Sequence, residues 1–192
     1  MFERYSYPSR QVIFLSRVIA AHAQAQAIEA SHLTGALIIG DQGIRIAERL
    51  GAASFDLSYL FGFKRPMWPS LLTRELADAL LDSVGLRFSM PHLPTSEDIP
   101  VSEEVSSVFG AAAALPRAGE AVEPDHLWLG LLREGSLSAH LSNSNSSDEK
   151  FEKLVRDHLS AIPPISVQDI EKAATAALTQ EDIEDERKNW DL

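Results

Sequence analysis

The sequence predicts an all-α protein made of two similar helical repeats, with an insertion between them and a helical tail. One motif occurs twice in the 192 residues: Glu-Ala-Ser-His-Leu begins at Glu29, and Glu-Pro-Asp-His-Leu begins at Glu123. A serine precedes each copy at an equivalent position, Ser6 in the first and Ser102 in the second. Duplication of this length indicates one supersecondary unit that is made twice and packs against itself. No sustained run of alternating β-branched residues is present, which argues against strands.

The first repeat, residues 1–61, begins with apolar residues at helical spacing, among them Leu15 and Ile19. Ser6 is a suitable N-cap for this helix because its hydroxyl can accept a free backbone N–H, and Pro8 is tolerated in the first turn. Three further helices are expected in this repeat, over residues 31–39, 44–50 and 55–61.

The second repeat, residues 99–161, follows the same plan. Ser102 is expected to cap its first helix, and Pro124 suits the first position of the next one. Two more helices are expected, over residues 137–141 and 148–161. The last of these carries on one side Phe151, Leu154, Val155 and His158.

Two segments lie outside the duplication. Residues 62–98 join the repeats, and four of their apolar residues predict one helix by their spacing: Leu72, Leu76, Leu80 and Val84. Residues 162–192 form a tail with an expected amphipathic helix and more acidic than basic residues. The acidity suits either a solvated end that keeps the protein soluble or a docking segment for a basic surface of a partner.

Composition excludes several function classes. A net charge of −11 argues against a nucleic-acid partner, because phosphate backbones require clustered Lys and Arg. No apolar run approaches the ~20 residues of a membrane span, so no membrane association is expected. The first residues lack the basic and then apolar pattern of a secretory signal, which favours the cytoplasm. The absence of cysteine excludes disulfides and thiolate metal sites.

The six histidines invite a metal or catalytic interpretation, which their spacing does not support. None forms a His-Glu-x-x-His motif, and Gly-x-Ser-x-Gly is also absent. His32 and His126 stand at equivalent positions of the two repeats, which favours a structural role in helix packing. We therefore expect no metal, no cofactor and no catalytic residue.

The motifs resemble the N-terminal domain of Clp AAA+ unfoldases, particularly the ClpC type. The resemblance rests on Met-Phe-Glu-Arg-Tyr-Ser at residues 1–6 and on His-Leu-Trp-Leu-Gly-Leu-Leu-Arg-Glu-Gly at residues 126–135. It covers about residues 1–60 and 99–161. It implies two four-helix repeats related by a pseudo-two-fold axis, and a role in recognising adaptors and substrates. The phosphate-binding loop of the ATPase ring, Gly-x-x-x-x-Gly-Lys-Ser/Thr, does not occur in the sequence, so the resemblance is to the recognition domain alone.

Some ClpC-type domains bind phosphorylated arginine, so the resemblance also implies candidate sites. Each repeat of the family pairs the hydroxyl of its opening motif with the acidic residue before His-Leu. Carried over, one site would use Ser102 and Asp125, and the other would use Ser6 and Ser31, which has lost the acid. The alternative is structural: both opening serines cap helices, and Asp125 favours the positive end of its helix.

Trp68 is a second candidate contact residue. It lies between two prolines and shortly after Arg65, in the segment between the repeats. Interface hot spots are enriched in Trp and Arg, so an exposed Trp68 would suit a partner anchor. Burial of the indole against the body of the protein is the alternative.

These observations favour a non-catalytic protein-binding module that serves a Clp protease system as accessory, adaptor or decoy. Two alternatives remain at this stage. The same fold could hold a small-molecule sensor or an enzyme with a pocket between the repeats, or it could be a module for homo-oligomerisation.

Overall fold

The computed structural model describes residues 2–43, 68–86 and 99–172. Within these ranges the secondary structure is helical, with three isolated bridges and no strand, so the expected all-α fold is confirmed. The helices expected over residues 44–50 and 55–61 lie outside the described residues.

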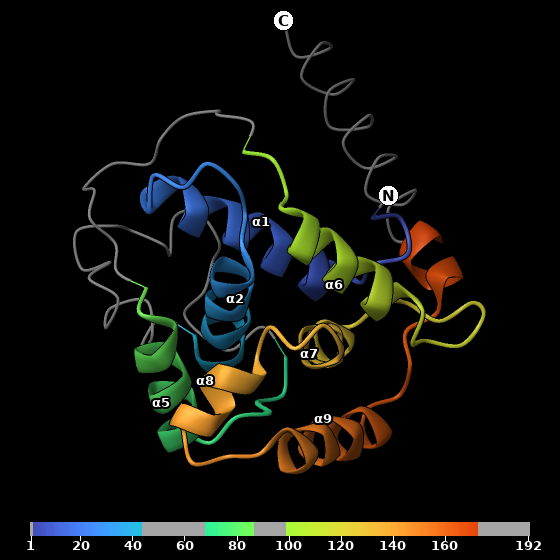
Figure 1. Ribbon diagram of the computed structural model, residues 1–192. Coiled ribbons are helices and arrows are strands. Elements are labelled where there is room, and N and C mark those ends of the chain that lie inside the picture. The colour runs from blue at the N-terminus through green and yellow to red at the C-terminus, as the bar shows by residue number, and fades with distance from the viewer. Residues whose placement is uncertain (1, 44–67, 87–98, 173–192) are drawn as a thin grey trace, which may run out of the picture.

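The observed helices match most of the expected ones (Figure 1). In chain order they are α1 (Tyr7–His22), α2 (Ala30–Gln42), α5 (Arg74–Val84), α6 (Glu103–Ala113), α7 (Pro124–Arg133), α8 (Ser138–Asn143) and α9 (Asp148–Ala161). The chain is helical again over residues 167–172, where the helix of the tail was expected to begin.

The predicted helix starts are confirmed by their hydrogen bonds. The Ser6 hydroxyl accepts the N–H of Ser9 at 3.4 Å, and the Ser102 hydroxyl accepts the N–H of Val105 at 3.2 Å. Each bond satisfies one of the backbone donors that a helix leaves free in its first turn. Pro124 is the first residue of α7, where its missing N–H costs no helical bond.

The two equivalent histidines complete the first turns of α2 and α7. Nδ1 of His32 accepts the N–H of Glu29 at 3.0 Å, and Nδ1 of His126 accepts the N–H of Glu123 at 2.9 Å. The expected structural role is therefore confirmed, and its chemistry is helix capping. Because Nδ1 must stay unprotonated to accept this bond, the neutral ring is the form that the fold uses.

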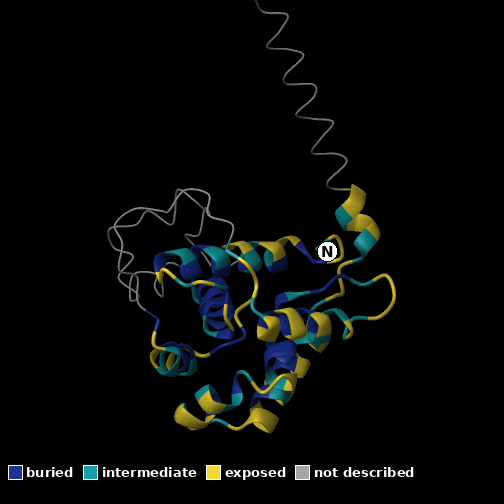
Figure 2. Cartoon of the chain, turned by 45° about the horizontal axis from the view of Figure 1, so that its top comes forward, coloured by how far each residue is buried: buried dark blue, intermediate teal, exposed yellow. Residues whose placement is uncertain are grey.

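The core lies around α2 and α7 (Figure 2). Nearly every residue of α2 is buried, so this helix runs through the centre of the molecule with no solvent-facing side. Helix α1 packs on α2 and helix α6 packs on α7, as two copies of one unit would. Helix α9 covers α7 through Phe151 and Val155, while Leu154, expected on the same side, is 37% exposed.

Backbone hydrogen bonds join the two repeats reciprocally. The N–H of Ser6 donates to the carbonyl of Val122 at 3.1 Å, and the N–H of Ser102 donates to the carbonyl of Ile28 at 3.1 Å. Thus the start of the first repeat lies beside the segment before α7, and the start of the second repeat lies beside the segment before α2. This exchange supports the expected duplication and brings residues of one repeat to the α7 end of the other.

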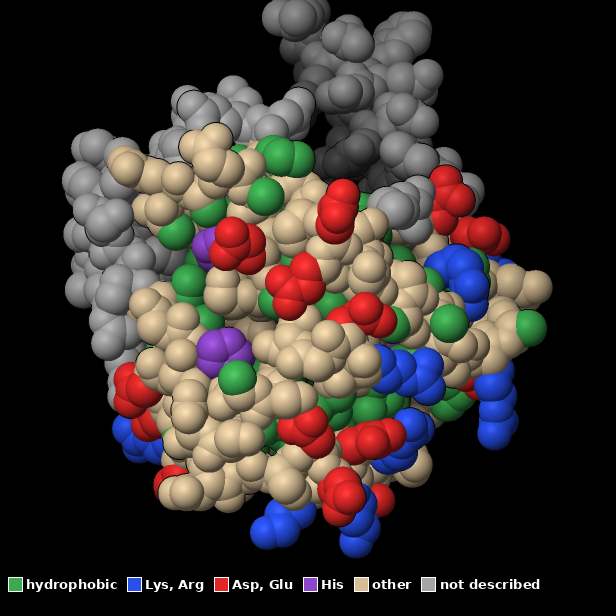
Figure 3. Space-filling model, viewed as in Figure 1, with side chains coloured by type: hydrophobic (Ala, Val, Ile, Leu, Met, Phe, Trp, Pro, Cys, Tyr) green, Lys and Arg blue, Asp and Glu red, His purple; other side chains and the backbone are tan. Residues whose placement is uncertain are grey.

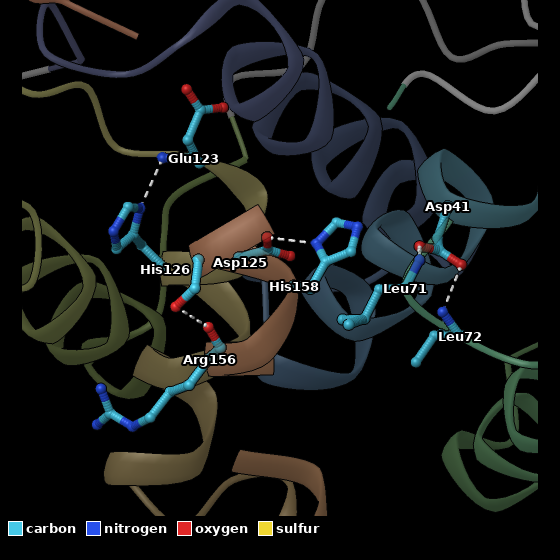
Figure 4. Close-up of polar contacts among 9 residues, drawn as sticks. Asp41, Leu71, Leu72, Glu123, Asp125, His126, Arg156 and His158 are labelled. Atoms are coloured by element: carbon cyan, nitrogen blue, oxygen red, sulfur yellow. Dashed lines mark hydrogen bonds and ion pairs between the residues drawn. The ribbon is translucent and has the colours of Figure 1, made fainter. Parts of the chain in front are cut away.

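The buried carboxylate of Asp41 fixes the position at which the chain returns to the body. Its Oδ1 accepts the N–H of Leu71 at 2.6 Å, and its Oδ2 accepts the N–H of Leu72 at 3.1 Å (Figure 4). Bonds to an ionised carboxylate are stronger than those between neutral groups. This attachment sets Trp68 against the surface of α2 at Gly40, where an added Cβ would lie 2.1 Å from the indole ring.

Replacing Gly40 by Ala should therefore displace Trp68 and lower the free energy of unfolding by about 1–3 kcal/mol, the usual cost of overpacking. Urea denaturation measures the stability, and the indole N–H resonance of Trp68 reports the displacement. Gly110→Ala is the matched control: Gly110 is an exposed residue of α6 with open space around it, so this change should raise stability by up to about 1 kcal/mol. An unchanged Trp68 resonance in Gly40→Ala would contradict the packing described.

After α9 the chain runs back along the second repeat. The N–H of Ala121 donates to the carbonyl of Ile165 at 2.8 Å, and the N–H of Val167 donates to the carbonyl of Gly119 at 2.9 Å. The beginning of the tail is therefore attached to the segment that precedes α7. Residues 162–165 and the first residues of α7 line one cavity.

Candidate functional site

A cleft of about 580 Å³ lies at the start of α7. It is enclosed by the last turn of α9, by residues 162–165 and by the segment that begins at Trp68. Much of its wall is apolar, with side chains that include Trp68, Pro69, Leu159, Ile162 and Pro163. An apolar cleft with a few converging polar groups is the usual form of a binding site.

Asp125 supplies the most buried acidic group of this cleft. Its side chain is 4% exposed, and its Oδ2 lies 2.7 Å from Nδ1 of His158 on α9. Figure 4 shows the carboxylate and the imidazole ring directed toward each other. Burial raises the pKa of Asp125 above its ordinary value, and the hydrogen bond and charge of His158 oppose this shift. The second oxygen, Oδ1, is buried and has no hydrogen-bond partner among the described residues.

Glu123 brings a second carboxyl to the same cleft. Burial raises its pKa above the ordinary value, the hydroxyl of Ser6 opposes the shift, and the charge of Asp125 adds to it. Its Oε1 is also buried without a partner among the described residues. The charge of Asp125 thus disfavours ionisation of Glu123, and a cation that enters the cleft would stabilise the ionised form of both carboxyls.

Two further polar atoms in the cleft have no partner within the described part of the chain. They are Nε2 of His158 and the indole Nε1 of Trp68. Native proteins satisfy about 90% or more of their buried polar groups, so a cluster of four such atoms requires an explanation. A ligand that carries hydrogen-bond donors would satisfy the carboxylate oxygens. Water would take its place when no ligand is bound.

The charge around the cleft is mainly negative. Glu120, Glu123 and Asp125 line it, and Arg117 is the one arginine or lysine among the lining residues that the structure describes. Acidic side chains are spread over the face shown in Figure 3, while the Lys and Arg side chains lie mainly toward its lower and right edges. Among the described lining residues, three acidic side chains thus stand against one arginine.

Two of the residues that the sequence singled out, Asp125 and Trp68, meet in this cleft. Trp68 is half-buried against Gly40, so its indole is a wall of the cleft and not a freely exposed anchor. Arg65 lies outside the described residues.

The expected pairing of the hydroxyl residues differs from the observed arrangement. Ser6 was expected beside Ser31, and Ser102 beside Asp125. The backbone instead joins Ser6 to the segment before α7, and Ser102 to the segment before α2, because the opening segment of each repeat hydrogen-bonds to the other repeat. The pairing is therefore corrected to one between repeats: the hydroxyl of Ser6, which is fully buried, hydrogen-bonds to the side chain of Glu123.

Sequence reasoning missed two polar groups of this site. Glu123 was visible as the repeat equivalent of Glu29, but its motif gave no sign that one oxygen would stay unpaired. His158 was placed on the apolar side of its helix with Phe151 and Val155. Its contact with Asp125 spans 33 positions of the chain, and no local pattern reports such a contact.

No protein-family model and no curated protein matches the sequence. Solved structures that match its fold include two N-terminal domains. The N-terminal domain of the caseinolytic-protease-associated chaperone ClpD from Arabidopsis thaliana aligns with a TM-score of 0.54 at 19% identity, over 83% of this chain and 99% of that domain. The Hsp104 N-terminal domain from Candida albicans aligns with a TM-score of 0.54 at 13% identity, over 85% of this chain and 97% of that domain.

The chain has the fold of the Clp and Hsp104 N-terminal domains. The resemblance that the repeated motifs indicated is thus confirmed at the level of the fold. In this Clp-N-like fold the described residues contain no helix with the length and apolarity that a membrane crossing needs. They also contain no cluster of three or more His, Asp or Glu side chains able to hold a metal ion.

Proposed function

We propose that the chain is a non-catalytic protein-recognition module and that the cleft at the start of α7 is its contact site. One observation carries the proposal: the buried, unpartnered oxygen of Asp125 lies in a largely apolar cleft of a Clp-N-like fold. An unmet acceptor in such a cleft favours binding of an external donor. The chaperone association in the name of the ClpD neighbour supports polypeptides as the bound class.

Within this proposal, the module acts in a Clp protease system as accessory, adaptor or decoy. The 192 residues include no phosphate-binding loop, so ATP-driven unfolding requires another polypeptide segment. The ClpC-type resemblance adds phosphoarginine as a candidate tag, with Asp125 for the guanidinium and Ser6, Ser31 and Ser102 as the hydroxyl positions of the two repeats.

Asp125→Asn should reduce capture of partners at least tenfold, because it removes the charge of the acceptor and keeps its shape. The immobilised chain would be incubated with a native lysate, and recovered proteins would be quantified by mass spectrometry. Clp components or their clients are the expected partners of the unmodified chain.

Glu149→Gln is the matched control, since it changes the net charge equally at an exposed position of α9. Glu149 lies nine residues from His158, about 14 Å along the helix. Equal recovery of the same partners by Asp125→Asn, Glu149→Gln and the unmodified chain would refute the cleft as the contact site.

A small-molecule sensor is the second candidate, because the cleft has the size and the mixed apolar and polar lining of a metabolite site. Native mass spectrometry of the protein purified under gentle conditions separates the two. A defined small mass that is retained by the unmodified chain and lost in Asp125→Asn would favour the sensor.

A further inference from the structure

We propose that this cleft binds a basic side chain of a partner polypeptide, arginine or lysine, in its unphosphorylated form. The inference rests on the proposed function and specifies the chemistry of the same site. Three features support it: two carboxyl oxygens have no hydrogen-bond donor among the described residues, backbone N–H groups at the start of α7 are already bonded, and much of the cleft wall is apolar.

Two carboxyl oxygens of the cleft have no hydrogen-bond donor among the described residues. The side chain of Asp125 is 4% exposed, and its Oδ1 and the Oε1 of Glu123 are both buried and unpartnered among the described residues. His158 occupies only the other oxygen of Asp125, at 2.7 Å. The ring thereby orients the carboxylate and leaves Oδ1 without a hydrogen-bond donor among the described residues. A guanidinium or ammonium group supplies both the donors and the positive charge that these two oxygens need.

Beyond Arg117, the start of α7 offers an anion few free hydrogen-bond donors. Helix N-termini bind phosphate through free backbone N–H groups. Here Pro124 has no N–H, the N–H of Glu123 donates to Nδ1 of His126, and the N–H of His126 donates to the carbonyl of Glu123 at 3.0 Å. A phosphorylated side chain would also place a charge of about −2 beside the carboxyls of Asp125 and Glu123.

The walls suit the hydrocarbon part of a basic side chain. Leu159, Ile162 and Pro163 provide apolar surface along which a three- or four-carbon stem can lie while its charged end reaches the carboxylates. The indole of Trp68 lies in the same cleft, where its ring can attract the cation and its unpartnered Nε1–H can donate to a peptide carbonyl. A short polypeptide segment supplies the stem, the cation and the carbonyl together.

The test uses the full chain and five capped pentapeptides that differ only in the central residue: arginine, lysine, citrulline, phosphoarginine and glutamate. Citrulline keeps the shape of arginine and removes its charge. Binding is measured by NMR titration of backbone amides and of the Trp68 indole N–H. The arginine or lysine peptide should bind at least tenfold more tightly than the citrulline and phosphoarginine peptides, and the glutamate peptide should not bind.

Two substitutions locate the binding. Asp125→Asn and Glu123→Gln should each weaken the arginine or lysine peptide at least tenfold, while Glu149→Gln should change its affinity less than twofold. Amide spectra of each variant verify that it is folded. The peptide series is measured on the unmodified chain, so it tests the proposal even if a variant does not fold. Equal affinity for citrulline and arginine, or tighter binding of phosphoarginine, would overturn the proposal.

The outcome also separates this inference from the proposed function. If no basic peptide binds while Asp125→Asn still abolishes capture of partners, the ligand chemistry is wrong and the recognition role stands. If basic peptides do not bind and capture is insensitive to Asp125, both are wrong.

Discussion

Replacing Trp128 by Ala should lower the free energy of unfolding by about 3–5 kcal/mol, the range found for large aromatic side chains in closed cores. Trp128 is fully buried on α7, and its ring meets that of Phe151 on α9 edge to face, with centroids 5.4 Å apart. The change would leave a cavity between the helix that carries Asp125 and the helix that carries His158.

Trp128→Phe is the informative control for this substitution. It retains the ring contact with Phe151 and removes an indole N–H that has no partner among the described residues, so the loss should be smaller than for alanine. Urea denaturation followed by circular dichroism measures both variants. A loss below about 1 kcal/mol for Trp128→Ala would contradict the close packing of α9 on α7.

Acidification should destabilise the protein through His126. Burial lowers the pKa of His126 from 6.5 to about 4, with the charge of Glu120 opposing the shift. The unfolded chain therefore takes up a proton below pH 6.5, whereas the folded chain takes it up only below about pH 4. Stability that is fully present above pH 6.5 is lost as the pH falls toward 4, by up to about 3 kcal/mol for this residue. Burial lowers the pKa of His32 as well, so this histidine also contributes stability that is lost as the pH falls.

His126→Asn isolates this contribution, because the amide oxygen can still accept the N–H of Glu123 and does not titrate in this range. The difference in unfolding free energy between the unmodified chain and the variant should shrink steadily from pH 7 to pH 4. Asp125 and Glu123, whose raised pKa values act with the opposite sign, are present in both proteins and cancel in the difference to first order. A difference that does not change with pH would show that His126 is not held in its neutral form.

Local patterns were enough to predict the helices of the second repeat. Ser102 and Pro124 mark helix starts because capping and the missing proline N–H act within one turn. The spacing of apolar residues likewise predicted α9, whose observed bounds are those expected. The duplicated motif then indicated the fold, since it repeats the capping glutamate and histidine that start α2 and α7.

The site itself depended on contacts that no local pattern contains. The exchange of backbone bonds between repeats places Ser6 beside Val122, so pairing residues within one repeat gave the wrong neighbours. The contact between Asp125 and His158 and the wall at residues 162–165 arise from the packing of α9 and the return of the chain along the second repeat. Trp68 lies in the lining of the cleft, and its position follows from its packing on Gly40 and from the bonds of Asp41, which no local pattern contains.

The most direct test of the account asks whether a partner polypeptide enters the cleft. A photo-crosslinking amino acid would be placed at Ser160, an exposed residue that lines the cleft, and separately at Glu149 on the first turn of the same helix. After capture and illumination, the account predicts a covalent adduct with the captured partner from Ser160 and none from Glu149. Adducts from Glu149 with none from Ser160 would place the partner elsewhere and contradict the assignment of the cleft.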